Sequence, residues 1–114
     1  MPDESPPPPT TLLLCRDLMF ASKVTATARA TGQAVQVVRD PAQLPPKGNR
    51  LLVDLNQDGA LDAAAAWRTS SGGAVVGFVS HVDTETIARA RNAGLDQVLT
   101  RGRFTADLES ILKG

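Results

Sequence analysis

The feature that most constrains the fold is a series of short, largely continuous apolar runs spread along almost the whole chain. They do not show the strict alternation of apolar and polar residues that is typical of a sheet with one wet face. A strand that is apolar at nearly every position is usually buried on both faces, as in parallel sheets covered by helices. The predicted strands are residues 11–15, 34–38, 51–55, 74–79 and 96–100.

Helical patterns separate most of these runs. Apolar residues recur at helical spacing or alanine dominates, and glycine or a capping side chain marks several of the ends. The exception is residues 40–49, where Pro41, Pro45 and Pro46 make a full helix unlikely. The predicted helices are residues 19–31, 60–70 and 84–93, followed by a last helix capped by Thr105.

This alternation predicts an α/β fold of the flavodoxin-like type. We expect a three-layer sandwich around a five-stranded parallel sheet in the order 2-1-3-4-5, with the second helix short or missing. The loops that follow the strands then meet at the carboxyl edge of the sheet, where open α/β sheets place their sites. The residues brought to that edge are Arg16, Asp17, Asp54, Ser80 and Arg101.

Composition limits the partners that the chain is expected to bind. Twelve basic and twelve acidic residues give a formal net charge of zero, which provides no electrostatic reason to bind nucleic acid or an anionic membrane. No apolar stretch approaches a membrane span, and the single cysteine cannot form an internal disulfide, so we expect a cytoplasmic protein. Residues 1–10 hold five prolines and are expected to form a disordered tail before one domain, residues 11–114.

The segment VVGFVSHVDTETIARARNAGLDQVLTRGRF, residues 75–104, resembles the corresponding part of response-regulator receiver domains, the CheY-like family. In both, an apolar strand runs into Ser or Thr, a helix ends in Ala-Gly, and a short strand ends in a basic residue. The resemblance extends over residues 11–113. It implies a signalling module that is not an enzyme and that acts by protein–protein interaction.

The resemblance also assigns roles to the residues at the sheet edge. It implies that Asp54 is the phosphoacceptor equivalent, that Ser80 is the hydroxyl that binds the phosphoryl group, and that Arg101 replaces the usual Lys. The family's two magnesium-binding acids correspond to Cys15 and Arg16, and Asp17 follows one position late. Asn56, in the loop after residues 51–55, completes the predicted pocket.

The loss of the acidic pair decides the functional prediction. Magnesium requires several hard oxygen ligands, which a thiol and a guanidinium do not supply, and Arg16 adds a positive charge where the ion would bind. We therefore expect a pseudo-receiver with no cofactor and no metal, in which Arg16 or Arg101 pairs with Asp54. The alternative is a working receiver of a two-component phosphorelay, with Asp54 as acceptor and Asp17 helping to hold the ion.

The resemblance further implies a surface for a protein partner or for self-association. Receivers commonly use their fourth helix, fifth strand and last helix, which correspond here to residues 84–93, residues 96–100 and the C-terminal helix. The chain ends soon after that helix, so we expect its effector to be another molecule. The predicted contact residues, chosen because they should face solvent, are Thr84, Arg91, Gln97, Arg103 and Asp107.

Other motifs in the chain suggest weaker alternatives. Residues 54–59 match the first half of an EF-hand calcium loop, but the position of its bidentate Glu is Ala65. A flavodoxin-like sheet can also hold flavin mononucleotide, although the loop after residues 11–15 is a poor match for a phosphate. His81 has no triad partner at a suitable spacing, and Cys15 is expected to be a buried apolar residue, with redox sensing as the minor option.

Overall fold

Five parallel strands form the centre of the computed structural model, which describes residues 11–80 and 83–113. The strand order is β2-β1-β3-β4-β5, as predicted, and every neighbouring pair is parallel. Each strand lies within one residue of its predicted position at either end. The strands are β1 (Thr11–Leu14), β2 (Val35–Val38), β3 (Arg50–Asp54), β4 (Ala74–Val79) and β5 (Gln97–Thr100).

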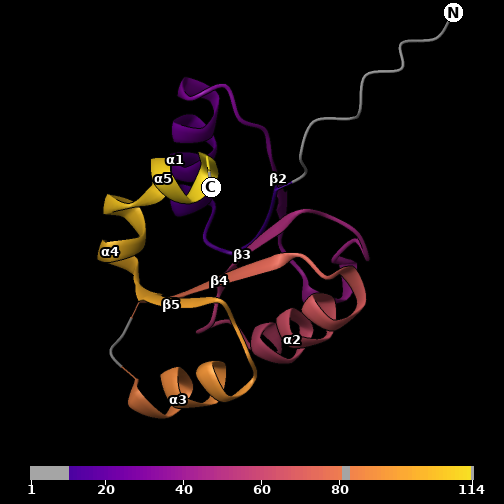
Figure 1. Cartoon of the computed structure of the whole chain (residues 1–114). Helices are drawn as coiled ribbons and strands as arrows, with labels where there is room; N and C mark the ends of the chain where they lie inside the picture. The colour runs from indigo at the N-terminus through magenta and orange to yellow at the C-terminus, as the bar shows by residue number, and fades with distance from the viewer. Residues whose placement is uncertain (1–10, 81–82, 114) are drawn as a thin grey trace, which may run out of the picture.

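Helices cover both faces of the sheet, which confirms the three-layer prediction. Helices α1 (Leu18–Ala30) and α5 (Leu108–Lys113) lie on one face, and α2 (Ala60–Ser71) and α3 (Thr84–Asn92) on the other (Figure 1). Successive residues of β1 point alternately to the two layers. Leu12 and Leu14 join the core on the α2 side, while Leu13 and Cys15 join the core on the α1 side. Both faces of the strand are therefore buried, which explains its unbroken apolar sequence.

The connection from β2 to β3 has no α-helix. It carries a single 3-10 turn, η1 (Pro41–Gln43), in which the Asp40 side chain accepts a hydrogen bond from the Ala42 N–H at 2.9 Å. Pro45 and Pro46 follow and cannot donate backbone hydrogen bonds to a longer helix. The predicted short or missing second helix is confirmed.

The C-terminal segment differs from the prediction of one helix capped by Thr105. Helix α4 (Arg101–Ala106) begins directly after β5, and α5 follows one residue later. Thr100 provides the cap, since its side chain accepts a hydrogen bond from the Arg103 N–H at 3.2 Å. Thr105 lies inside α4, where its hydroxyl donates to the Arg101 carbonyl at 2.8 Å.

Two of the predicted features lie outside the described residues: the tail of residues 1–10, and His81. Within residues 11–80 and 83–113, no helix is long and apolar enough to cross a membrane.

Candidate functional site

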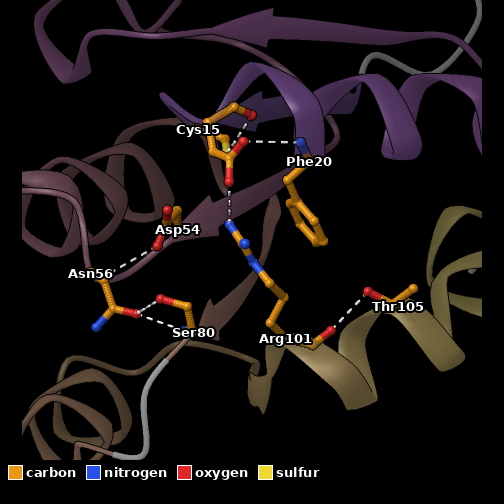
Figure 2. Close-up of polar contacts among 8 residues, drawn as sticks. Cys15, Phe20, Asp54, Asn56, Ser80, Arg101 and Thr105 are labelled. Atoms are coloured by element: carbon orange, nitrogen blue, oxygen red, sulfur yellow. Dashed lines mark hydrogen bonds and ion pairs between the residues drawn. The ribbon is translucent and has the colours of Figure 1, made fainter.

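Four residues that follow or end a strand meet at the carboxyl edge of the sheet. Asp54 is the last residue of β3, Cys15 and Ser80 follow β1 and β4, and Arg101 follows β5. Figure 2 shows their side chains around one small region, as the strand order requires. The structure thus brings together the residues that the sequence pattern placed there.

Arg101 lies across this region and pairs with an acid other than the one predicted. Its guanidinium Nη2 is 3.3 Å from Oδ2 of Asp17, and its Cζ lies 4.0 Å from the centre of the Phe20 ring. Figure 2 shows the Arg101 side chain extending between Asp54 and Phe20. No ion pair joins Arg16 or Arg101 to Asp54 among the described residues, so that prediction is wrong.

The reason for this choice of partner is the position of α1. Asp17 is the N-cap of α1, and Phe20 is in the first turn of the same helix. A cation above an aromatic ring is attracted by its negative face, so Phe20 guides the guanidinium toward the start of α1. The Arg101 side chain is only 30% exposed there, which weakens screening by solvent.

Asp17 uses both carboxylate oxygens within the protein. Oδ1 accepts a hydrogen bond from the Phe20 N–H at 3.1 Å, and Oδ2 faces Arg101. The hydrogen bond from Phe20, together with the Arg101 guanidinium, holds the pKa of Asp17 below its ordinary value. This carboxylate is therefore charged at neutral pH and already has two partners.

A chain of hydrogen bonds joins Asp54 to Ser80 through Asn56. The Asn56 N–H donates to Oδ1 of Asp54 at 3.0 Å. Oδ1 of Asn56 accepts from the Ser80 N–H at 2.6 Å and from the Ser80 hydroxyl at 2.9 Å (Figure 2). The loops after β3 and β4 are thereby held together, and the Ser80 hydroxyl proton is directed at Asn56.

Cys15 belongs to the hydrophobic core on the α1 side of the sheet. It is fully buried, and its thiol donates to the Asp17 carbonyl at 3.6 Å. Burial raises the pKa of the Cys15 thiol above its ordinary value, and the charge of Asp54 acts in the same direction. A thiol of this kind is mostly protonated at neutral pH, which does not favour reactivity.

A shallow hollow of about 440 Å³ opens beside Asp54. Arg16, Asp17, Asn56 and Asp58 contribute to its wall, and Arg16 itself is exposed. Sequence reasoning did not assign Asp58 or Phe20 to the site. Asp58 was visible as a second acid four residues after Asp54, whereas no sequence pattern indicates that Phe20 lies under Arg101.

The described residues include no group of three or more His, Cys, Asp or Glu side chains that could hold a metal ion. Residues 54–59, which match the first half of an EF-hand loop, lie between a strand and a helix. Asp54 ends a strand, and Gly59, with φ of 77°, is the N-cap of α2, so the segment connects a strand to a helix. An EF-hand requires a helix on both sides of its loop.

The five residues of the predicted partner surface differ in their exposure to solvent. Thr84, Arg91, Gln97 and Arg103 are exposed. Asp107 is only partly exposed, because it lies between α4 and α5 and its carboxylate accepts a hydrogen bond from Arg103 at 2.9 Å. Four of the five residues therefore face solvent as predicted.

Comparison with solved structures finds the same fold in receiver domains. A CheY-like response regulator receiver domain protein from Methanospirillum hungatei superimposes with a TM-score of 0.80 at 14% identity, over 94% of this chain and 92% of that one. A response regulator from Thermotoga maritima gives 0.72 at 14% identity, over 95% and 100% of the two chains. The signal receiver domain of the putative response regulator NarL from Mycobacterium tuberculosis gives 0.72 at 17% identity, over 95% and 96%.

No protein-family model matches the chain. No curated protein sequence matches it either. At these identities the structural similarity establishes the receiver-type fold of the chain.

Proposed function

We propose that the chain is a non-catalytic signalling module of the receiver type, which acts by binding protein without magnesium-dependent phosphorylation. The observation that carries this proposal is the Arg101 guanidinium, paired with Asp17 and stacked on Phe20 beside Asp54. In this arrangement a fixed side-chain cation supplies the positive charge at the carboxyl edge of the sheet. The charge at this site would then stay the same, whereas in a phosphorylated receiver it changes when the acceptor gains a phosphoryl group.

The donor atoms support the same conclusion. Cys15 is buried and protonated, Arg16 is a cation, and both oxygens of Asp17 have partners. Asp54 and Asp58 remain, and two separate carboxylates do not build the near-octahedral oxygen shell that magnesium requires. A divalent ion would also be repelled by the guanidinium of Arg101. The residues present do not fit magnesium.

Acetyl phosphate with magnesium, followed by intact mass measurement, tests the proposal directly. We expect no phosphoryl adduct that depends on Asp54. Asp54→Asn is the matched control, because it removes the acceptor oxygen and keeps the shape of the side chain. An adduct on the parent chain that disappears in Asp54→Asn would establish the phosphorelay alternative.

A magnesium titration followed by amide NMR shifts provides a second readout. The amides of Asp17, Asn56 and Asp58 belong to residues that line the hollow and should not move in millimolar magnesium. Arg101→Lys offers a matched comparison, since the ammonium keeps the positive charge and loses the planar guanidinium that lies over Phe20 and pairs with Asp17. Saturable shifts confined to these amides in the parent chain would contradict the proposal.

Signalling without phosphorylation requires a surface that a partner protein recognises. We assign this role to α3, β5 and the C-terminal helical segment of α4 and α5. Thr84, Arg91, Gln97 and Arg103 are exposed there, and Asp107, between α4 and α5, is partly exposed. The exposed arginines favour an acidic partner surface or a second copy. Arg91→Glu should weaken self-association in light scattering or partner capture in a pull-down. Lys23→Glu, an exposed charge reversal on α1, should leave both unchanged.

A further inference from the structure

The turn between β3 and α2 contains an Asp-Gly pair at the carboxyl edge of the sheet. Asp58 and Gly59 are both exposed, and the Ala60 N–H closes the turn by donating to the Gln57 carbonyl at 3.1 Å. Gly59 has φ of 77° and ψ of −5°, which are the angles of the third residue of a type II turn. We call residues 57–60 the Asp-Gly turn.

An aspartate that is followed by glycine can rearrange without an enzyme. The nitrogen of the next residue attacks the carbon of the side-chain carboxyl group, a C–N bond forms, and the carboxyl OH leaves with the amide proton as water. A second water molecule then opens the five-membered succinimide ring. Opening at the side-chain carbonyl restores aspartate. Opening at the backbone carbonyl leaves isoaspartate, whose main chain runs through the former side chain.

Both reacting groups of the Asp-Gly turn lack a competing contact. Within residues 11–80 and 83–113, the Gly59 N–H donates no hydrogen bond, and the Asp58 carboxylate has neither a hydrogen-bond partner nor an ion-pair partner. A Cβ built on Gly59 would have its nearest neighbour, Cγ of Pro41, at 4.0 Å. The approach to the Gly59 nitrogen is therefore open.

The attack also requires the peptide unit between Asp58 and Gly59 to rotate. The hydrogen bond that closes the turn joins the Gln57 carbonyl to the Ala60 N–H, on either side of this unit, so the unit can turn while the bond is kept. Glycine accepts positive and negative φ about equally, so Gly59 can absorb the rotation.

Other exposed aspartates of the chain are held more firmly. Asp62 lies in the first turn of α2, and the next N–H, that of Ala63, donates to the Gly59 carbonyl at 3.1 Å. The carboxylate of Asp83 accepts a hydrogen bond from the Glu85 N–H at 3.1 Å. In both cases a hydrogen bond must break before the ring can close.

We propose that Asp58 is a site of spontaneous isomerisation, which inserts one methylene group into the main chain of the Asp-Gly turn. Asp58 lines the hollow beside Asp54 and also a second hollow, of about 230 Å³, whose wall includes Leu61 and Asp83. A longer main chain displaces the start of α2 from the end of β3 and so changes both hollows. This inference does not depend on whether Asp54 accepts a phosphoryl group.

Ageing the folded full chain in heavy-oxygen water tests the proposal, with electron-transfer dissociation of its peptides to distinguish isoaspartate from aspartate. We expect residue 58 to gain isoaspartate and one heavy oxygen. It should gain at least about tenfold more isoaspartate than Asp62, where the first turn of α2 must open before reaction. Asp58→Glu is the matched control, because it keeps the carboxylate but would have to close a six-membered ring, so residue 58 should gain no label.

A free peptide of residues 54–63 provides the reference rate without the fold. Asp58 in the folded chain should isomerise within about tenfold of its rate in this peptide. A slower rate would show that the native turn protects the pair, and would overturn the proposal. Equal labelling of Asp58, Asp62 and Asp83 would also overturn it.

The structural consequence has its own readout in amide NMR of the aged chain. The amides of Asn56 and Ala60, on either side of the Asp-Gly pair, should shift as isoaspartate accumulates. The amide of Ala88, on α3, should not. Isoaspartate at residue 58 without shifts at Asn56 and Ala60 would refute the change in the two hollows.

Discussion

Replacing Gly73 with Ala should destabilise the protein by overpacking the space between the Trp67 ring and the Gly48 backbone, just after the end of α2. A Cβ at this position would lie 2.5 Å from Cη2 of Trp67 and 2.9 Å from the Gly48 carbonyl oxygen. Neither neighbour moves easily, since Trp67 is only 3% exposed and the Gly48 oxygen belongs to the backbone. Overpacking of this kind costs about 1–3 kcal/mol in the free energy of unfolding.

Gly102→Ala is the matched control for this substitution. Gly102 lies inside α4 and has no positive φ, and a Cβ added there would have no neighbouring atom within 4 Å. Gly102 is the second residue of α4, and replacing a glycine by Ala where the backbone conformation suits both residues stabilises by about 0.4–1 kcal/mol. The same chemical change should therefore have opposite signs at the two positions, with a difference of about 1.4–4 kcal/mol.

Urea unfolding, followed by Trp67 fluorescence and by far-ultraviolet circular dichroism, measures both effects. With an m-value of about 2 kcal/mol/M, a loss of about 2 kcal/mol lowers the midpoint by about 1 M. The reasoning would be refuted by a Gly73→Ala midpoint equal to that of the parent. It would also be refuted if Gly102→Ala were the less stable of the two variants.

Three further predictions concern the core and the titrating groups. Phe104→Ala should cost about 3–5 kcal/mol by calorimetry, because Phe104 is fully buried and stacks on Phe78 at 4.5 Å between ring centres; a loss below about 1 kcal/mol would contradict this. Cys15 should react slowly with a thiol reagent through neutral pH and fully in urea, since burial raises its pKa; rapid native labelling would disprove the burial. The hydrogen bond from Arg68 lowers the pKa of Asp96 in the folded state, so its stabilisation is present above about pH 4 and is lost as pH falls through the lowered value. Asp96→Asn should accordingly flatten the stability profile below about pH 4 in acid-urea titrations, and an unchanged slope would remove Asp96 as the cause.

Much of the fold could be predicted because its signals are local. A short apolar run such as residues 51–53 indicates a buried strand from its composition alone. The prolines within residues 40–49 disfavour a long helix whatever the surrounding tertiary structure. Once the strands are known to be parallel, their carboxyl ends must share one edge of the sheet. That is why the meeting of Cys15, Asp54, Ser80 and Arg101 followed from sequence order.

The pairing within the site did not follow from the sequence. Arg101 has several rotatable bonds and two acids within the same region, Asp17 and Asp54, and sequence spacing cannot choose between them. The choice depends on α1 packing so that Phe20 lies under the guanidinium at 4.0 Å. The sequence also did not predict that α4 starts at Arg101. Thr100 caps that helix because it is the last residue of β5 and its side chain reaches the Arg103 N–H, which depends on where β5 ends.

The chain by itself thus determined which segments are strands, which connection lacks a helix, and which residues stand at the carboxyl edge. These depend on properties of each segment: its apolar pattern, its prolines and its position in the strand order. Only the tertiary structure decided which carboxylate holds Arg101, and that Phe20 lies under its guanidinium. Those outcomes depend on the relative placement of helices far apart in sequence, which packing fixes and no local pattern encodes.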